Sequence, residues 1–255
     1  MKNLRCLIVK TRRRVDLILS TIKMQKLAGS TVKKYDIDWC IFLSNELQYF
    51  NWDKYPARTP FPDTFQPNKL VVLKLSSKQT ILWEGCCKYL PALKVLQLFD
   101  MQQLLHTPNF DGLPRLQELT LDCCNKLDKI HPSFENHTSL ESLNILGCWK
   151  LKLPVKISQM KNLKTLELKA CNLREGEIPY GIGELFNLQE LHLNRNCFSR
   201  LDFSLSQLTQ LKLLNVSYCY SLLELPELPS SLAVLKADYC KLQLSDNHWR
   251  LSWKL

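Results

Sequence analysis

The sequence predicts an α/β solenoid, a curved stack of short repeats with a concave parallel β-sheet and an irregular or short helical convex side. Two observations predict this fold. Aliphatic residues recur in the pattern L-x-x-L-x-L-x-x-C/N-x-L at a near-constant spacing, and one copy is too short to bury its own apolar side chains. The copies must therefore stack and share one elongated interior.

The leading leucines of eight copies are separated by 23, 23, 24, 23, 25, 23 and 21 residues. They are Leu70, Leu93, Leu116, Leu140, Leu163, Leu188, Leu211 and Leu232. Two weaker copies begin at Leu4 and Leu47. A spacing of about 20 to 29 residues is that of leucine-rich repeats, so we expect about ten repeats in a leucine-rich-repeat horseshoe.

The copy that begins at Leu163 shows how one repeat should fold. Leu166 and Leu168 alternate with polar residues, as a strand with one buried face requires. Leu163 and Leu173 flank that strand, and we expect both side chains to turn into the shared interior.

Six copies carry a cysteine or an asparagine eight residues after the leading leucine. These residues are Cys124, Cys148, Cys171, Asn196, Cys219 and Cys240. The backbone leaves the sheet at this corner, where a small buried side chain that forms hydrogen bonds satisfies groups left unpaired. Tyr55, Lys78 and Met101 occupy the same offset in earlier copies, and we expect those repeats to be less regular.

The positive charge is concentrated in the first part of the chain. The net charge is +10, and residues 1–46 hold ten Lys/Arg against four Asp/Glu, whereas the other residues hold 24 against 20. The segment Lys10 to Arg14 (KTRRR) is open to two interpretations, a nuclear-localisation or nucleic-acid patch, or a solvated loop after the first strand. We favour the loop and expect no nucleic-acid partner.

We therefore divide the chain into three parts. Residues 1–46 form a first repeat with the basic inserted loop, 47–242 the solenoid of about nine repeats, and 243–255 a tail. The tail alternates apolar and polar residues from Trp249 to Leu255, so it could form a capping strand over the last repeat.

Several classes of protein are disfavoured by missing motifs. There is no run of 18 apolar residues and no secretory leader of adequate length, so we expect no membrane span and a cytoplasmic, possibly nuclear, location. Eleven cysteines without a C-x-x-C pair predict neither a disulfide framework nor a metal site. Phosphate-binding loops, nucleophile elbows and metalloprotease motifs are absent, so we expect no enzyme activity and no cofactor.

Several stretches resemble a known family. Residues 47–56 (LQYFNWDKYP), 62–73 (PDTFQPNKLVVL) and 82–85 (LWEG) are similar to the opening of the leucine-rich-repeat region in plant TIR-type nucleotide-binding leucine-rich-repeat (TIR-NBS-LRR) disease-resistance proteins. Residues 225–232 (LPELPSSL) resemble the run that closes those repeats. The same motifs also have purely structural interpretations, since Trp83 suits a convex turn and Pro226 and Pro229 suit irregular turns.

The resemblance implies a protein-protein interaction module of a plant intracellular immune receptor. In this family the repeats contribute to pathogen effector recognition and to autoinhibition, and the partner is an effector or the receptor's nucleotide-binding domain. This sequence contains no phosphate-binding loop, so it would be a fragment or truncated form without the TIR and nucleotide-binding domains. An alternative is a stand-alone adaptor or scaffold without an immune role. An extracellular receptor-like repeat protein is disfavoured, because G-x-I-P occurs only once, at Gly176 to Pro179.

The binding surface is predicted from the alternation of side chains along each strand. Polar residues beside the buried leucines should point out from the concave sheet, and mixed charge with tyrosine and arginine is typical of protein contacts. The predicted contact residues are Lys164, Glu167, Lys169, Glu190, His192, Asn194, Arg195, Lys212, Asn215, Ser217, Tyr218, Lys236, Asp238 and Tyr239. His192 is also compatible with an exposed histidine that has no role in binding.

Overall fold

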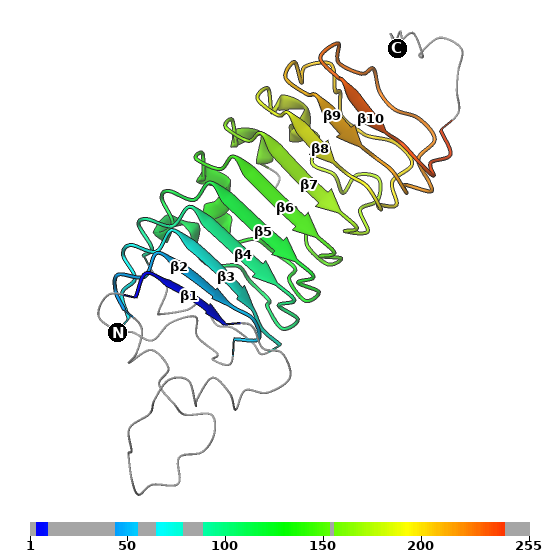
Figure 1. The fold of residues 1–255 in the computed structure, drawn as a ribbon. Coiled ribbons are helices and arrows are strands. Elements are labelled where there is room, and N and C mark those ends of the chain that lie inside the picture. Colours follow the sequence, from blue (N-terminus) through cyan, green and yellow to red (C-terminus); the bar gives the residue numbers. More distant parts are fainter. Residues whose placement is uncertain (1–3, 10–43, 56–64, 79–88, 154–155, 243–255) are drawn as a thin grey trace, which may run out of the picture.

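The protein is a curved solenoid built on one parallel sheet of ten strands (Figure 1). The computed structural model describes residues 4–9, 44–55, 65–78, 89–153 and 156–242. The strands lie side by side in chain order. They are β1 (Cys6–Val9), β2 (Tyr49–Trp52), β3 (Val72–Ser76), β4 (Val95–Phe99), β5 (Glu118–Asp122), β6 (Ser142–Leu146), β7 (Thr165–Lys169), β8 (Glu190–His192), β9 (Leu213–Asn215) and β10 (Val234–Lys236).

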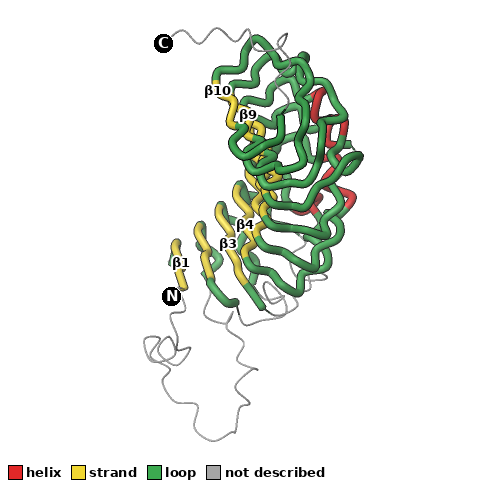
Figure 2. Tube along the Cα trace, turned by 90° about the vertical axis from the view of Figure 1, so that its right-hand side faces the viewer, coloured by secondary structure: helices red, strands yellow, loops and turns green. Residues whose placement is uncertain are grey.

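The sheet lines the concave side, and short 3₁₀ helices lie on the convex side (Figure 2). The helices are η2 (Phe110–Gly112), η3 (Pro132–Asn136), η4 (Ile157–Gln159) and η5 (Tyr180–Glu184). Asn109 caps η2 through its side chain, and Pro132 stands at the start of η3, which is a favoured place for proline. The horseshoe predicted from the repeat spacing is confirmed.

The repeat register places equivalent leucines next to one another across the sheet. Leu166 of β7 pairs with Leu143 of β6 and with Leu191 of β8, and all three side chains are fully buried. The copies that begin at Leu4 and Leu47 follow the same rule, because β1 pairs in register with β2. The strands therefore share one continuous apolar interior, which no single repeat supplies.

Phenylalanines fill the interior behind the sheet. Phe110 in η2 and Phe134 in η3 are buried, and their ring centroids lie 4.8 Å apart. Contacts of this kind join successive convex segments, as hydrogen bonds join successive strands in the sheet.

The residues predicted to form a ladder at the strand corners do so. Cys148 Sγ donates to the Leu121 carbonyl over 3.5 Å, and Cys171 Sγ donates to the Ile145 carbonyl over 3.4 Å. Each thiol thus bonds the backbone of the preceding repeat. Burial raises the pKa of Cys171 to about 12 and that of Cys219 to about 11, so these side chains stay protonated donors at neutral pH.

The earlier repeats are not irregular in their described strands. β3 and β4 have five residues each and pair without a break, although Lys78 and Met101 replace the ladder cysteine after them. Met101 is buried and fills the corner by its bulk, whereas Lys78 is exposed. β1 and β2 have four residues each, and the shortest strands are β8, β9 and β10 with three residues each, at the other end of the sheet.

Three sequence predictions lie outside the described residues. They concern the basic segment from Lys10 to Arg14, the convex turn at Trp83, and the capping tail at 243–255. The irregular turn predicted around Pro226 and Pro229 is present, because residues 222–229 adopt no regular secondary structure. Among the described residues, no helix is long and apolar enough to cross a membrane.

One backbone feature recurs after eight of the described strands. The residue directly before the ladder corner leaves the sheet through a left-handed conformation, with φ between 48° and 62° in these eight repeats. These strand-exit residues are Lys54, Asp100, Cys123, Gly147, Ala170, Arg195, Tyr218 and Tyr239. From Asp100 to Tyr218, each backbone N–H donates to a carbonyl of the next repeat, for example Tyr218 to Asp238 over 2.7 Å. The turn therefore extends the parallel ladder beyond the strand.

Candidate protein-binding surface

The concave face consists of the outward strand positions and the strand-exit residues. Its middle column runs through directly paired residues such as Asn144, Glu167, His192 and Asn215. Leucine, isoleucine or valine occupies the inward positions next to them, so the sheet presents polar side chains on one side and buries apolar side chains on the other.

The predicted contacts on β7 and β8 lie on this face. Glu167 and Lys169 are half-buried outward residues of β7, and Glu190 Oε2 lies 3.3 Å from His192 Nε2 on β8. Lys164 stands just before β7 and forms an ion pair with Glu141 over 2.7 Å. Lys164 is thus exposed but already has a carboxylate partner.

Two predicted contact residues are largely inaccessible. Asn194 is 8% exposed and Ser217 is 5% exposed. Ser217 donates from its backbone N–H to Asn215 Oδ1 and from its hydroxyl to Asp238 Oδ2. Both side chains lie mostly beneath the accessible surface of the concave face. Direct contacts with a partner would therefore be made by their exposed neighbours.

Arg195, Tyr218 and Tyr239 form a stack across three consecutive repeats. Arg195 Cζ lies 4.7 Å from the ring centroid of Tyr218. The Tyr218 and Tyr239 centroids are 4.8 Å apart and their planes differ by 15°. This separation equals the spacing of neighbouring strands, so the sheet itself positions the Arg–Tyr–Tyr stack. The ring of Tyr220 approaches the ring of Tyr218 edge-on, with 6.4 Å between the ring centroids.

The backbone under the stack indicates that its large side chains are not needed for folding. A left-handed conformation costs a residue with a Cβ roughly 1–2 kcal/mol, yet Arg195, Tyr218 and Tyr239 all adopt it. Gly147 and Ala170 fill the same position in earlier repeats, which shows that a small residue suffices.

The remaining predicted residues surround the stack. Lys212 is exposed just before β9, at the opposite end of the strand from the stack. Lys236 and Asp238 are exposed on or next to β10, and Asn215 is half-buried on β9. The C-terminal half of the face therefore combines aromatic rings, cations and carboxylates within four neighbouring repeats.

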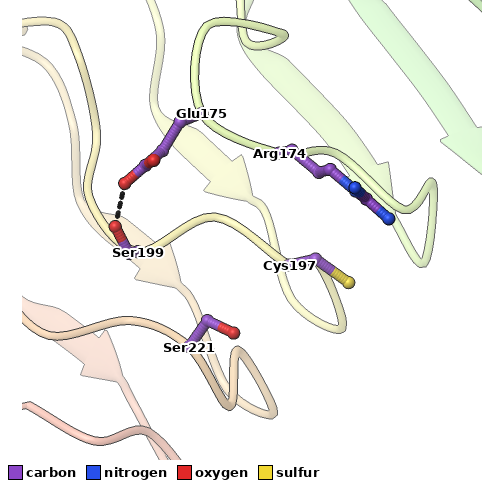
Figure 3. Close-up of a pocket in the computed structure, with 5 residues that line it drawn as sticks. All are labelled: Arg174, Glu175, Cys197, Ser199 and Ser221. Carbon is purple, nitrogen blue, oxygen red and sulfur yellow. Dashed lines mark hydrogen bonds between the residues drawn. The ribbon is translucent and has the colours of Figure 1, made fainter.

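A cavity that sequence reasoning missed lies in the loops that follow β7, β8 and β9. Its volume is about 550 Å³, and Figure 3 shows its lining residues Arg174, Glu175, Cys197, Ser199 and Ser221. Ser199 Oγ donates to a carboxylate oxygen of Glu175. The repeat that contains Arg174 and Glu175 is also the one with the 25-residue spacing, which is the signal that the sequence offered. In the described part of the chain, no group of three or more His, Cys, Asp or Glu side chains is placed to hold a metal ion.

Comparison with known proteins places these observations in a family context. The chain is 30% identical over 188 residues to disease resistance protein RPP2A of Arabidopsis thaliana, and 29% identical over 214 residues to TMV resistance protein N of Nicotiana glutinosa. It is also 33% identical over 284 residues to the disease resistance-like protein CSA1 of Arabidopsis thaliana. These matches cover 73%, 82% and 77% of this chain.

The chain is a leucine-rich-repeat region of the plant TIR-NBS-LRR disease-resistance type. It spans 14%, 18% and 24% of the lengths of those three relatives. No family model matches it. Among solved structures, internalin C2 of Listeria monocytogenes aligns with a TM-score of 0.55 and 16% identity, over 76% of this chain and 84% of that chain, which supports the repeat fold alone. The predicted resemblance to the resistance proteins is thus confirmed.

Proposed function

We propose that this leucine-rich-repeat region is the protein-interaction module of a plant intracellular immune receptor. It contributes to recognition of a pathogen effector and to autoinhibition through contact with a nucleotide-binding domain, in the cytoplasm or nucleus. The observation that carries this proposal is the preordered Arg–Tyr–Tyr stack on an open concave sheet.

The physical chemistry of the concave face supports a protein partner. Tyrosine and arginine are enriched among the residues that dominate binding energy in protein interfaces. In the stack these side chains are held by the sheet spacing, so little conformational entropy remains to be lost on binding. The relatives are named as resistance proteins, which supports the immune setting of that interaction.

Site-specific photo-crosslinking tests the proposed face. A photoreactive phenylalanine analogue would replace Tyr239 on the concave side, and in a second protein Tyr180 in η5 on the convex side. Both tyrosines are 67% exposed, so the two positions differ in face and not in accessibility. In a plant leaf extract, we expect position 239 to crosslink a discrete protein that position 180 does not.

The crosslinked protein would then be purified and its affinity measured against the whole chain. Replacing Arg195, Tyr218 and Tyr239 together with alanine should weaken binding at least tenfold, since each anchor contributes about 1 kcal/mol or more. Ala170 occupies the same backbone position, so alanine is compatible with the fold there. Equal crosslinking from both faces, or unchanged affinity of the triple variant, would contradict the proposal.

A further inference from the structure

We propose that Arg195 binds a carboxylate of an acidic, aromatic-containing segment in the partner protein, while the rings of Tyr218 and Tyr239 hold the side chain next to that carboxylate. This inference rests on the proposed function and specifies the partner chemistry that the concave face selects. Three features of the described residues carry it: the orientation of the guanidinium, the unpaired cations around it, and the exposure of the rings.

The guanidinium of Arg195 lies over the ring of Tyr218, with Cζ 4.7 Å from the ring centroid, and has no anionic partner among the described residues. Its N–H donors lie in the plane of the group, at its edge. Among the described residues, Arg200 forms an ion pair with Asp202 over 3.1 Å, whereas Arg195 forms none. Its planar fork of donors matches the two oxygens of a carboxylate.

The charges beside the stack also favour an acidic segment. Lys169 lies on β7, in the repeat before Arg195, and Lys236 lies on β10, in the repeat of Tyr239. Neither lysine has an ion-pair partner in the described part of the chain. Two carboxylates of the same repeats already have partners, since Asp238 accepts from the Ser217 hydroxyl and Glu190 lies beside His192.

The aromatic part of the stack is open to a second side chain. Tyr239 and Tyr220 are 67% and 62% exposed. Tyr218 lies between Arg195 and Tyr239 along the sheet, so the ring of Tyr239 ends the stack at its C-terminal side. A flat aromatic group next to the bound carboxylate would pack on these rings, which rotate about few bonds and lose little entropy.

Fluorescence anisotropy with three labelled twelve-residue peptides tests this chemistry on the full chain. The first peptide repeats Asp-Tyr-Gly-Ser, the second replaces aspartate with asparagine, and the third replaces it with lysine. We expect the aspartate peptide to bind at least tenfold more tightly than the other two. Its affinity should fall at least fivefold in Arg195→Lys, which keeps the charge but loses the planar fork. It should fall by a similar factor in Tyr239→Leu.

The matched control is Arg115→Lys, an exposed arginine just before β5, which should leave the affinity unchanged. Thermal unfolding of each variant would verify that the solenoid is intact. Equal affinities for the aspartate and asparagine peptides, or wild-type affinity in Arg195→Lys, would overturn the inference. Displacement of the aspartate peptide by an equimolar single-stranded oligonucleotide would also overturn it, since that result indicates unspecific attraction of anions.

The two proposals fail separately. If the peptides show no preference but photo-crosslinks form from position 239 and not from position 180, the concave face binds a partner of another chemistry and only the carboxylate inference is lost. If position 239 forms no selective crosslink either, both proposals are lost.

Discussion

At the scale of single residues, the left-handed conformation of the strand-exit residues sets how the chain leaves the sheet. It turns the chain out of the sheet while its N–H still bonds the next repeat, as Ala170 does to the Asn194 carbonyl over 3.0 Å. A glycine takes this conformation without a steric penalty, yet Gly147 is the one glycine among the eight described strand-exit residues. Most repeats therefore keep a strained residue at this point.

Exchanging the residues at positions 147 and 170 measures that strain directly. Ala170→Gly should raise the free energy of unfolding by about 0.5–1 kcal/mol, and Gly147→Ala should lower it by about 1–2 kcal/mol. A Cβ at Gly147 would meet Cys123 Sγ at 3.4 Å, an ordinary contact, so conformation and not crowding sets the cost. Urea denaturation of both variants is the measurement, and changes of the same sign would refute the interpretation.

His137 makes stability depend on pH. It is buried, its Nε2 lies 3.1 Å from the Leu116 carbonyl oxygen, and burial lowers its pKa below the usual 6.5. The unfolded chain therefore takes up a proton more readily than the folded chain. The contribution to stability is complete above about pH 6.5 and is lost as the pH falls through the lower pKa of the folded state.

The expected result is a lower urea midpoint at about pH 5 than at about pH 7, with a smaller difference in His137→Gln, which cannot titrate. The comparison between the two proteins removes the contribution of the other histidines. If both proteins lose the same stability on acidification, His137 is not the group responsible.

At the scale of one repeat, Asn196 replaces the thiol of the ladder with a denser set of hydrogen bonds. Its Oδ1 accepts from the N–H groups of Cys171 and Leu173, both at 3.1 Å, and its Nδ2 donates to the Leu168 and Leu193 carbonyls at 2.7 and 2.8 Å. It thereby holds the start of the exit loop in the 25-residue repeat with four hydrogen bonds, more than any described cysteine rung forms through its side chain.

Asn196→Ala should destabilise the chain by about 3 kcal/mol or more, because several buried backbone groups lose their partners at once. Cys219→Ala, on the next rung, removes one weak bond to the Leu193 carbonyl and should cost about 1 kcal/mol. Thermal unfolding of the two variants gives the comparison. Similar losses would show that the rung is held by packing and not by these bonds.

The repeat pattern predicts the strands and the ladder because both follow from spacing alone. A constant repeat length is sufficient to place Leu166 and Cys171 next to the equivalent residues of the neighbouring repeats. The left-handed turn has no such signature, since only Asp100 and Gly147 are residue types usually found at positive φ, whereas Lys, Cys, Ala, Arg and Tyr occupy the other repeats. The stack was partly foreseeable, because Arg195, Tyr218 and Tyr239 share one offset in successive repeats. Their ring geometry requires the three-dimensional register.

At the scale of the whole molecule, the C-terminal end of the sheet differs from its middle. In the repeat of β9, the core residues Leu211, Leu214, Val216 and Cys219 are fully buried. The equivalent residues of the last described repeat are Leu232, Leu235, Ala237 and Cys240, and they are only partly buried. Because each repeat packs only on its neighbours, this loss of burial weakens the repeat of β10 without weakening the centre.

Native-state hydrogen exchange should therefore show a gradient of opening free energy along the solenoid. The β10 amides that donate to β9 should exchange first, those of β9 next, and those of β5, β6 and β7 only through global unfolding. Partial burial of four core side chains instead of full burial reduces the apolar stabilisation of the last repeat by several kcal/mol in gross terms, so the difference in protection should span more than tenfold. Leu166→Ala in β7 provides the control, since a cavity at the centre should lower the protection of β5 to β7 more than that of β10. Uniform protection from β5 to β10 would mean that the sheet opens as one cooperative unit.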